Sequence, residues 1–259
     1  MRKYLFISYP KSGRTWLRVI FDELGVTVRY DHMGTGSARP DWGRRWRGVD
    51  PAVDLSAWSQ IIFLYRDPRD VVVSFFHQMH RRERLTPRQY VAFWLSRRLP
   101  PSDMHRFAAH PGFGIERVAR YNLDWMRVLS CDGRAVLLSY ERLQLDPYGE
   151  VRALLDFLHL SGISDESVRA AIDNCLFDRM RDKERSGAYA RRYGEILMPA
   201  DISDPDSYKV RRGQVGAYLS EMQPRTIDYA SHVLANCDYF AEVSQLAAIS
   251  RAGQRLCCG

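Results

Sequence analysis

The chain has 259 residues, a formal net charge of +7 and a hydrophobic content of 46%, which is enough for a sizeable core. No apolar run approaches the ~20 residues that span a bilayer, and the first apolar run is too short for a signal peptide. The five cysteines are odd in number and lack metal-ligand spacing, so a reducing cytoplasm is the expected setting. The basic residues are scattered without a nucleic-acid motif, so the charge favours an anionic cofactor over nucleic acid.

The first 25 residues predict a strand, a basic turn and a helix. Residues 5–7 are an apolar run typical of a buried strand, and residues 10–14 form a basic turn with one glycine. Apolar residues then recur at the spacing of a core-facing helix, at Leu17, Ile20, Phe21 and Leu24. The backbone N–H groups of residues 12–15 are therefore expected at a helix N-terminus beside Lys11, an arrangement that binds phosphate or sulfate. An ordinary strand-to-helix turn with a surface lysine is the alternative.

A second strand and a long loop are expected next. Residues 26–30 alternate like a short strand. The turn that follows, at residues 31–36, is expected at the sheet edge where open parallel sheets bind ligands. Residues 33–58 show no clear period and predict a long loop, either a lid over the substrate or a poorly ordered segment.

Capping signals mark the helices in the middle of the chain. Residues 61–65 are a fully apolar strand, after which Asp67 as N-cap and Pro68 at N1 begin a valine-rich helix. A Thr/Gln capping box with proline at N1 begins another helix at Thr86. The remaining predicted elements are an amphipathic helix, a buried strand and two helices, at residues 118–129, 135–138, 146–158 and 164–175.

Two C-terminal segments show little apolar periodicity. Residues 181–213 are charged and contain several Gly, Pro and Ser residues, so they predict a mobile loop or lid. A capping-box spacing at residues 220–223 precedes the last clear helix, at residues 224–236, and residues 245–259 form a weakly specified tail. Helical patterns alternate with short apolar runs, which favours a single α/β domain over residues 1–259, with a central, mostly parallel sheet flanked by helices.

The basic turn near the N-terminus carries a specific motif. It reads Tyr9-Pro10-Lys11-Ser12-Gly13-Arg14-Thr15-Trp16. A Walker A loop has its lysine after the last of several glycines, whereas here the lysine precedes the single glycine. The motif instead resembles the 5′-phosphosulfate loop, YPKSGTTW, of the sulfotransferases that use 3′-phosphoadenosine 5′-phosphosulfate (PAPS), with one departure at Arg14. The resemblance implies a P-loop-like turn that binds the phosphosulfate of PAPS.

Three further segments resemble PAPS-binding parts of the same family. FLYRDPRDVVVSFFH is similar to its 3′-phosphate motif, in which Arg66 and Ser74 would bind that phosphate. In SYERLQLDPYGEVRALLDFLHL, Tyr140 would reach the adenine edge. In IDNCLFDRMRDKE, Phe177 would stack on adenine opposite Trp16. From the residues alone, a capped turn and ordinary core packing of the aromatic rings are the alternatives.

The last motif, Arg211-Arg212-Gly213-Gln214-Val215-Gly216, resembles the family's RKGxxG loop, which closes over the 3′-phosphate. Ala217-Tyr218 stands where an acidic residue and a tryptophan are usual. The resemblance runs in the expected order from residue 4 to about residue 235. The cofactor-binding residues that it implies are Lys11, Ser12, Gly13, Arg14, Thr15, Trp16, Arg66, Ser74, Tyr140, Phe177, Arg211, Arg212 and Gly213.

The resemblance also implies the chemistry. Sulfuryl transfer from PAPS is an in-line displacement that releases adenosine 3′,5′-bisphosphate (PAP), so catalysis consists mainly of positioning and charge stabilisation. Lys11 is expected to neutralise the oxygen between sulfur and phosphorus, and His32 is the predicted base, with a loop histidine without a role as the alternative. The family commonly has Lys-x-His at this place, where the lysine position is Tyr30. His77 and His80 are weaker candidates, and no metal is required.

Two other functions stay open at this point. A P-loop kinase that transfers phosphoryl from ATP with magnesium is disfavoured by the position of Lys11. A protein that binds PAP or PAPS without turnover is allowed by the altered lid motif and the missing lysine. The acceptor hydroxyl or amine belongs to a small molecule, lipid or carbohydrate that the sequence does not specify, and a homodimer is left open.

Overall fold

The structure, a computed structural model, describes residues 2–33, 43–83, 86–96 and 98–257, so the first part of the expected loop at 33–58 lies outside the described residues. Within these ranges the chain forms one sheet of four parallel strands in the order β2-β1-β3-β4. The strands are β1 (Tyr4–Ser8), β2 (Arg29–Asp31), β3 (Gln60–Tyr65) and β4 (Ala135–Ser139). The predicted α/β architecture with a central parallel sheet is confirmed.

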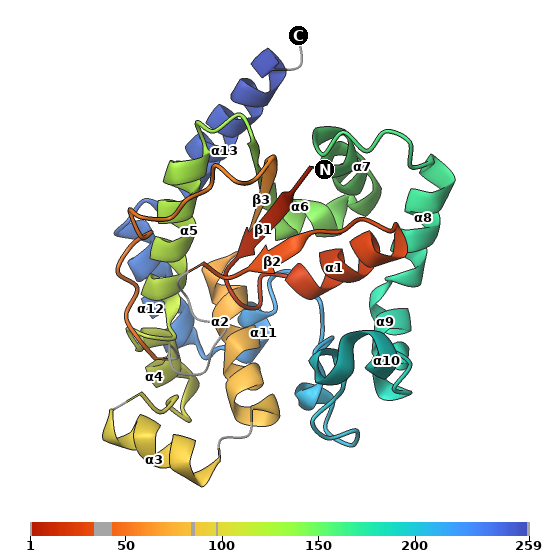
Figure 1. The fold of residues 1–259 in the computed structure, drawn as a ribbon. Coiled ribbons are helices and arrows are strands. Elements are labelled where there is room, and N and C mark those ends of the chain that lie inside the picture. The colour runs from red at the N-terminus through yellow and green to blue at the C-terminus, as the bar shows by residue number, and fades with distance from the viewer. Residues whose placement is uncertain (1, 34–42, 84–85, 97, 258–259) are drawn as a thin grey trace.

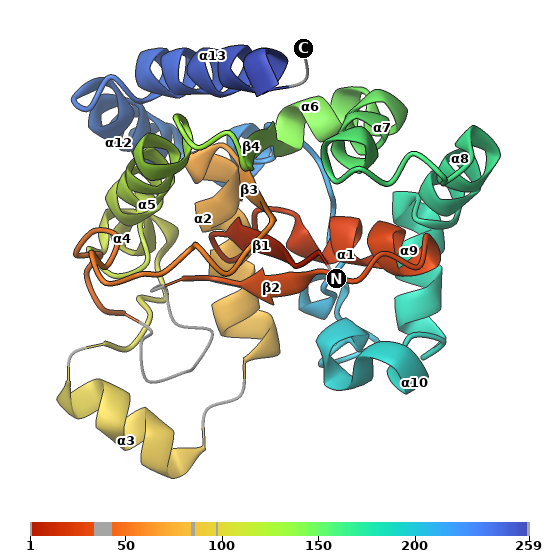
Figure 2. The same ribbon diagram turned by 45° about the horizontal axis from the view of Figure 1, so that its top comes forward.

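Helices cover both faces of this sheet (Figure 1). One group packs around α5, and its members are α2 (Pro68–His77), α4 (Met104–Ala109), α5 (Ile115–Leu129), α11 (Tyr218–Glu221), α12 (Pro224–Ala235) and α13 (Tyr239–Cys257). The other group consists of α1 (Arg14–Glu23), α6 (Tyr140–Leu145), α7 (Pro147–Phe157), α8 (Asp165–Asn174), α9 (Phe177–Arg185) and α10 (Ala190–Tyr193). A π-helical turn, η2 (Gln78–Arg82), continues α2, and Figure 2 shows α3 (Pro87–Leu95) set apart from both groups.

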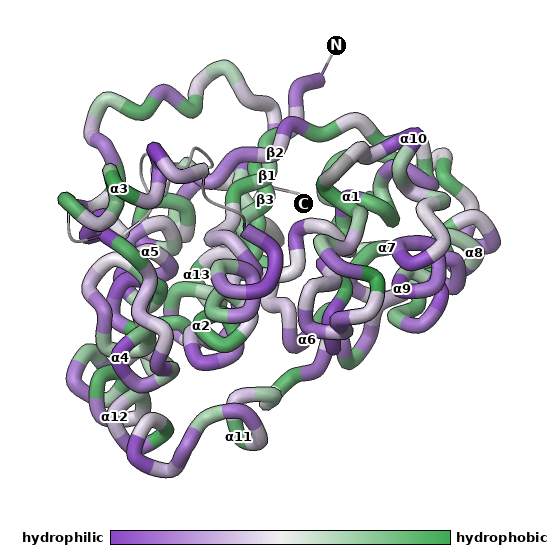
Figure 3. The backbone as a smooth tube through the Cα atoms, turned by 90° about the horizontal axis from the view of Figure 1, so that it is seen from below, coloured by the Kyte–Doolittle hydropathy of each residue, from purple (hydrophilic) through white to green (hydrophobic). Residues whose placement is uncertain are grey.

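The strand residues alternate between two hydrophobic cores. Leu5 and Ile7 of β1 belong to the core under α2 and α5, whereas Phe6 belongs to the core under α1 and α7. The neighbouring strand β3 follows the same alternation, since Ile61 pairs with Leu5 and Ile62 with Phe6. A sheet that is covered on both faces needs apolar residues at every strand position. This explains the continuous apolar runs in the sequence and the hydrophobic strands at the centre of Figure 3.

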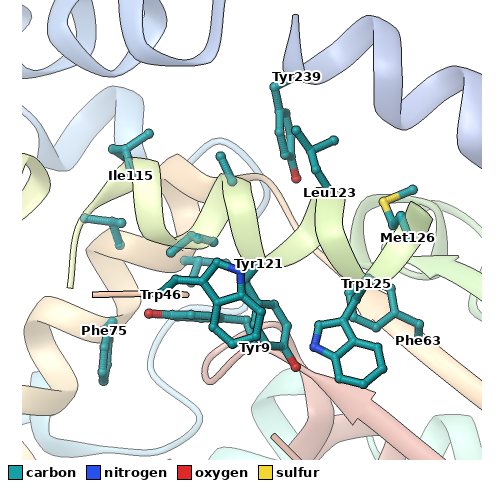
Figure 4. Close-up of a cluster of buried hydrophobic side chains, with 14 of the residues drawn as sticks. Tyr9, Trp46, Phe63, Phe75, Ile115, Tyr121, Leu123, Trp125, Met126 and Tyr239 are labelled. Carbon is teal, nitrogen blue, oxygen red and sulfur yellow. The ribbon is translucent and has the colours of Figure 1, made fainter. Parts of the chain in front are cut away.

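A cluster of aromatic rings lies between the sheet and α5 (Figure 4). Tyr121 is at its centre, with ring centroids 5.2 Å from Tyr9 and 4.9 Å from Trp46. Trp46 also donates a hydrogen bond from Nε1 to Asp124 at 2.8 Å. These contacts fix part of residues 43–58, a segment that contains no helix or strand, against α5. Tertiary contacts, and not regular secondary structure, therefore hold the described part of this segment in place.

The capping predictions are confirmed where a side chain closes the first turn. The Asp67 carboxylate accepts the N–H of Arg69 at 2.9 Å, and Pro68 occupies N1 of α2. Thr86 and Gln89 form the reciprocal capping box that begins α3. Such caps satisfy helix N–H groups that lack a partner within the helix, so they specify where a helix begins even when its residues have low helix propensity.

Two predicted segments differ from the structure. The second strand is β2 at Arg29–Asp31 rather than residues 26–30, because Val26 still donates its N–H to Phe21 at the end of α1. Residues 181–213 are not a continuous loop, since they contain the end of α9, all of α10 and two 3₁₀ turns, η3 (Gly194–Leu197) and η4 (Pro205–Ser207). The buried Glu184 organises this segment by accepting the N–H groups of Lys209 and Val210 at 2.6 and 2.9 Å. A buried carboxylate therefore holds this segment in place, and the lack of apolar periodicity did not reveal it.

The C-terminal expectations were also wrong in part. Ser220 does not cap a helix, because it lies inside α11 and donates to the carbonyl of Ala217. The N-cap of α12 is Gln223, which makes no side-chain cap bond. Most of the expected weakly specified tail belongs to α13, whose contacts with α5 are tertiary and do not show in its own sequence pattern. Among the helices of the described ranges, none has both the length and the apolar character needed to cross a bilayer.

Candidate active site

A cavity of about 510 Å³ lies at the carboxyl edge of the sheet. Its lining includes the residue that directly follows each described strand, namely Tyr9, His32, Arg66 and Tyr140. This edge is where open parallel sheets bind ligands. All of the site residues expected from the sequence line this one cavity except Ser12, which is fully buried beside it.

The turn at residues 10–15 has the backbone of an anion-binding loop. Lys11 and Gly13 adopt left-handed conformations, with φ of 72° and 102°. A Cβ on Gly13 would lie 2.3 Å from Cδ2 of Tyr140, so only glycine lets the turn pack against that ring. Gly13 is also the N-cap of α1 and provides no capping side chain. The first N–H groups of α1 are thus left without a side-chain acceptor at the cavity, where an anion is favoured.

Two lysines meet in this cavity although they are far apart in sequence. Lys11 Nζ donates to Gln78 Oε1 at 3.2 Å, and Lys209 Nζ donates to the same oxygen at 3.4 Å. Burial, followed by the charge of Lys209, holds the pKa of Lys11 well below its usual value. Burial, followed by the charge of Arg82, lowers the pKa of Lys209 to about 8. The positive charges of the two lysines and of neighbouring arginines thus oppose each other in this cavity, so an anion bound there would stabilise them.

Lys209 was not predicted from the sequence. A signal was present in the composition, because the chain contains only four lysines, at positions 3, 11, 183 and 209. Two of the four line this cavity. The contact between them depends on Gln78 in η2 and on the fold of residues 194–210, which no local pattern indicated.

Arg66 connects the basic turn with the loop that follows Lys209. Its guanidinium donates to the carbonyl oxygens of Lys11 at 3.3 Å and of Gln214 at 2.9 Å. It also lies 4.3 Å above the centre of the Tyr140 ring and 3.6 Å from the Asp70 carboxylate. Its buried Nε has no hydrogen-bond partner among the described residues, so the guanidinium keeps donor capacity for an anion.

Residues 211–218 are anchored on α2 in spite of the altered motif. The Asp70 carboxylate accepts the N–H groups of Gly216 and Tyr218 at 2.8 and 3.1 Å. Arg211 forms a two-point ion pair with Glu221, with N–O distances of 2.9 and 2.7 Å. Burial raises the pKa of Glu221, but hydrogen bonds from His77 and Arg211 outweigh it and lower this pKa to about 2. The ionised carboxylate of Glu221 in α11 thus holds Arg211, at the start of this loop, in place.

The aromatic residues expected at adenine also line this cavity. Trp16 donates from Nε1 to the carbonyl of Cys175 at 2.9 Å, which fixes the plane of the indole. Phe177 is half-buried and lies against Gly213, where a Cβ would approach its Cδ2 to 2.8 Å. The Tyr140 hydroxyl donates to the Gly213 carbonyl at 3.1 Å. Three aromatic side chains and one glycine are therefore gathered on the wall of the cavity, as the adenine prediction requires.

His32 is oriented by the strand beside it. Its side chain is 8% exposed, and its Nδ1 lies 2.7 Å from the carbonyl oxygen of Ser8. Because a carbonyl only accepts, Nδ1 carries the proton and Nε2 carries the lone pair in the neutral ring. Burial and the nearby charge of Arg14 lower the pKa of His32 to about 3, so the ring is neutral at physiological pH. The neutral ring can accept a proton at Nε2, and its low pKa makes it a weak base in the protein without ligands.

The two weaker histidine candidates point elsewhere. His77 places Nε2 2.7 Å from Glu221 and thus contributes to the loop anchor. His80 places Nδ1 2.8 Å from the carbonyl oxygen of Phe76. Neither belongs to the cavity lining, whereas His32 does. The described residues contain no group of three His, Cys, Asp or Glu side chains placed to hold a metal ion.

The family of the chain follows from a match of the sulfotransferase domain model to residues 54–242. The chain belongs to the sulfotransferase domain family. The match includes Arg66, Ser74 and residues 211–216, but it begins after the turn at residues 10–15, whose role rests on its own motif and geometry. This membership disfavours the ATP-dependent kinase.

Solved sulfotransferase structures share the fold. Mouse sulfotransferase SULT7A1 complexed with PAP matches with a TM-score of 0.60 and 16% sequence identity, over 91% of this chain and 84% of that chain. Retinol dehydratase in complex with androsterone and the inactive cofactor PAP matches with a TM-score of 0.53 and 18% identity, over 91% and 81% of the two chains. A second complex of retinol dehydratase, with retinol and PAP, matches with a TM-score of 0.53 and 17% sequence identity, over 91% of this chain and 81% of that chain.

Proposed function

We propose that this protein transfers a sulfuryl group from PAPS to a hydroxyl or amine group of an acceptor. The observation that carries this proposal is the convergence of five sequence motifs on one cavity at the carboxyl edge of the sheet. Each motif comes from a different part of the chain, and their representatives in the cavity lining are Lys11, Arg66, Tyr140, Phe177 and Arg212. The sulfotransferase and the retinol dehydratase that were solved in complex with PAP have the same fold, which supports a nucleotide of this kind at the same edge.

The residues of the cavity fit PAPS in charge and in hydrogen bonding. The buried Ser12 Oγ and Arg66 Nε have no hydrogen-bond partner among the described residues, and α1 begins without a side-chain cap. Phosphate oxygens would satisfy such donors, since an unsatisfied buried donor costs about 1–3 kcal/mol. When bound, PAPS supplies the sulfuryl group, and PAP is the product that leaves.

Each residue near the basic turn has a distinct role in the proposed mechanism. Lys11 binds the oxygen between phosphorus and sulfur and stabilises the negative charge that develops there. Lys209 places a second ammonium beside it, which replaces the lysine that the family commonly has two residues before the histidine. Neutral His32 accepts the proton of the acceptor at Nε2. The side chain of Ser74, on the cavity wall two turns into α2, binds the 3′-phosphate together with Arg66.

Calorimetric titration with PAP, AMP and ATP, with and without magnesium, tests the donor site. We expect PAP to bind at least tenfold more tightly than AMP or ATP, independently of magnesium. Ser74→Ala should weaken the binding of PAP but not of AMP, because it removes a hydroxyl that contacts the 3′-phosphate in the proposed site, and Arg66→Ala should weaken PAP binding further. Arg120→Ala, at an exposed ion pair on α5, is the control.

Product analysis then separates an enzyme from a binding protein. Incubation with PAPS and a panel of hydroxyl compounds should yield sulfated product by mass spectrometry. Tight PAP binding without product from any acceptor would favour binding without turnover. A magnesium-dependent preference for ATP would contradict the proposed function.

A further inference from the structure

A second cavity, of about 630 Å³, lies beside the first. We call it the arginine cavity, because five arginines line it: Arg44, Arg45, Arg47, Arg98 and Arg117. Among its described lining residues, Asp50 is the one carboxylate that faces them. The lining therefore carries an excess of positive charge, which favours an anion in this cavity.

The arginine cavity is joined to the candidate active site by shared residues. Arg117 lines both cavities and is only 4% exposed, held by a hydrogen bond to the Gly112 carbonyl and by the Tyr9 ring 6.0 Å away. Two consecutive residues also line different cavities, since His32 lines the first cavity and Met33 lines the second. The predicted base is therefore one residue along the chain from the lining of the arginine cavity.

The aromatic cluster of Figure 4 forms part of the same wall. Trp46 and Trp125 both line the arginine cavity. The Tyr121 hydroxyl donates to the His32 carbonyl at 3.0 Å, and its ring packs on Trp46, so this wall and the base belong to one rigid unit. Trp125 is 1% exposed, and its Nε1 has no hydrogen-bond partner among the described residues. The wall thus combines a flat apolar surface with a buried donor that needs an acceptor atom.

We propose that the arginine cavity is the acceptor site and that the acceptor carries a phosphate, sulfate or carboxylate group in addition to the hydroxyl that is sulfated. This inference rests on the proposed function. The anionic group binds the arginines, because guanidinium groups match the geometry of such oxyanions, and the hydroxyl reaches toward His32. In the transfer, the acceptor oxygen forms the new S–O bond, its proton moves to His32 Nε2, and the electron pair of the broken S–O bond leaves with PAP.

Matched pairs of probes test the charge of the acceptor. One pair is 2-naphthol and 6-hydroxy-2-naphthoate, and the other is glucose and glucose 6-phosphate, so the two arms separate aromatic carboxylates from sugar phosphates. Binding is measured by calorimetry with the protein saturated with PAP, which keeps the probes out of the first cavity. We expect the anionic member of at least one pair to bind at least tenfold more tightly than the neutral member.

A triple variant locates the binding. Arg44→Gln, Arg45→Gln and Arg47→Gln together remove exposed side chains of the arginine cavity and should abolish the preference for the anion. The control variant, Arg179→Gln, Arg185→Gln and Arg225→Gln, removes the same charge from exposed sites that line neither cavity and should keep it.

Equal binding of the charged and neutral probes in both pairs overturns the inference, and so does a preference that survives the triple variant. Loss of the preference in the control variant also overturns it, because net charge alone would then explain the effect. The proposed function fails by a different result, namely no PAP binding and no sulfated product. If sulfated product forms equally well from both members of each pair, the function stands and the inference fails.

Discussion

The replacement of Lys209 by methionine tests the central electrostatic feature of the site. Methionine keeps most of the length of the side chain but removes the ammonium group. Lys209 and Lys11 share Gln78 Oε1 as hydrogen-bond acceptor, so the substitution removes one of two lysine amines that lie at the same point. Lys209→Arg retains the charge, and Lys3→Met, at an exposed position, is the matched control.

The magnitude follows from the charge that develops in the transfer. Two unit charges 4 Å apart interact by about 4 kcal/mol at an effective dielectric constant of about 20. If about half of a unit charge develops on the leaving oxygen, the loss of the ammonium costs about 2 kcal/mol, or roughly 30-fold in kcat. Binding of PAP should weaken as well, because the product retains its negative charge.

Stability should change in the opposite direction. Burial and neighbouring cations lower the pKa of Lys209 to about 8, so its charged form is disfavoured in the folded protein at pH 7. Lys209→Met removes this penalty and should stabilise the PAP-free protein by up to about 3 kcal/mol, less what is lost with the hydrogen bond to Gln78. If Lys209 had only a structural role, its replacement would lower kcat and the free energy of unfolding together.

The assay combines kcat for PAP release, with 6-hydroxy-2-naphthoate as acceptor, and urea unfolding at pH 7. Lys209→Arg should retain most of the activity. The reasoning is refuted if Lys209→Met leaves kcat within twofold of the parent, or if the loss of activity comes with a loss of stability that Lys3→Met does not show.

Three further predictions concern the turn, the base and the loop anchor. Gly13→Ala should destabilise the fold by at least about 2 kcal/mol in urea unfolding, because its Cβ would meet Tyr140 at 2.3 Å and its φ is 102°; unchanged stability would refute the close packing. Between about pH 6.5 and pH 3 the unfolded chain binds a proton at His32 that the folded state excludes, so stability should fall as the pH falls. From pH 7 to pH 5, wild type should lose about 2 kcal/mol more than His32→Gln, and parallel pH profiles would contradict the low pKa. Glu221→Gln should cost about 2 kcal/mol of stability and speed PAP dissociation in stopped-flow measurements, because Arg211 loses its two-point partner; an unchanged dissociation rate would argue against a lid role.

The sequence by itself determined the parts of this protein that depend on neighbouring residues. Continuous apolar runs predicted β1, β3 and β4 because a doubly covered parallel sheet leaves no polar face. Caps at Asp67 and Thr86 predicted where helices begin, since a cap acts within one turn. The resemblance of the first motif also predicted a phosphosulfate-binding turn that contains Lys11.

Only the tertiary structure decided which distant residues share a cavity. Lys209 shares the Gln78 acceptor with Lys11 because the buried carboxylate of Glu184 accepts the backbone N–H groups of residues 209–210. A hydrogen bond between a side chain and a distant backbone leaves no period in the sequence. In the same way, the arginines at residues 44–47 form one cavity with Arg117 only because Trp46 packs on α5. Patterns in the sequence reflect interactions between residues that are close in the chain, whereas a binding site depends on which surfaces the packing of the core brings together.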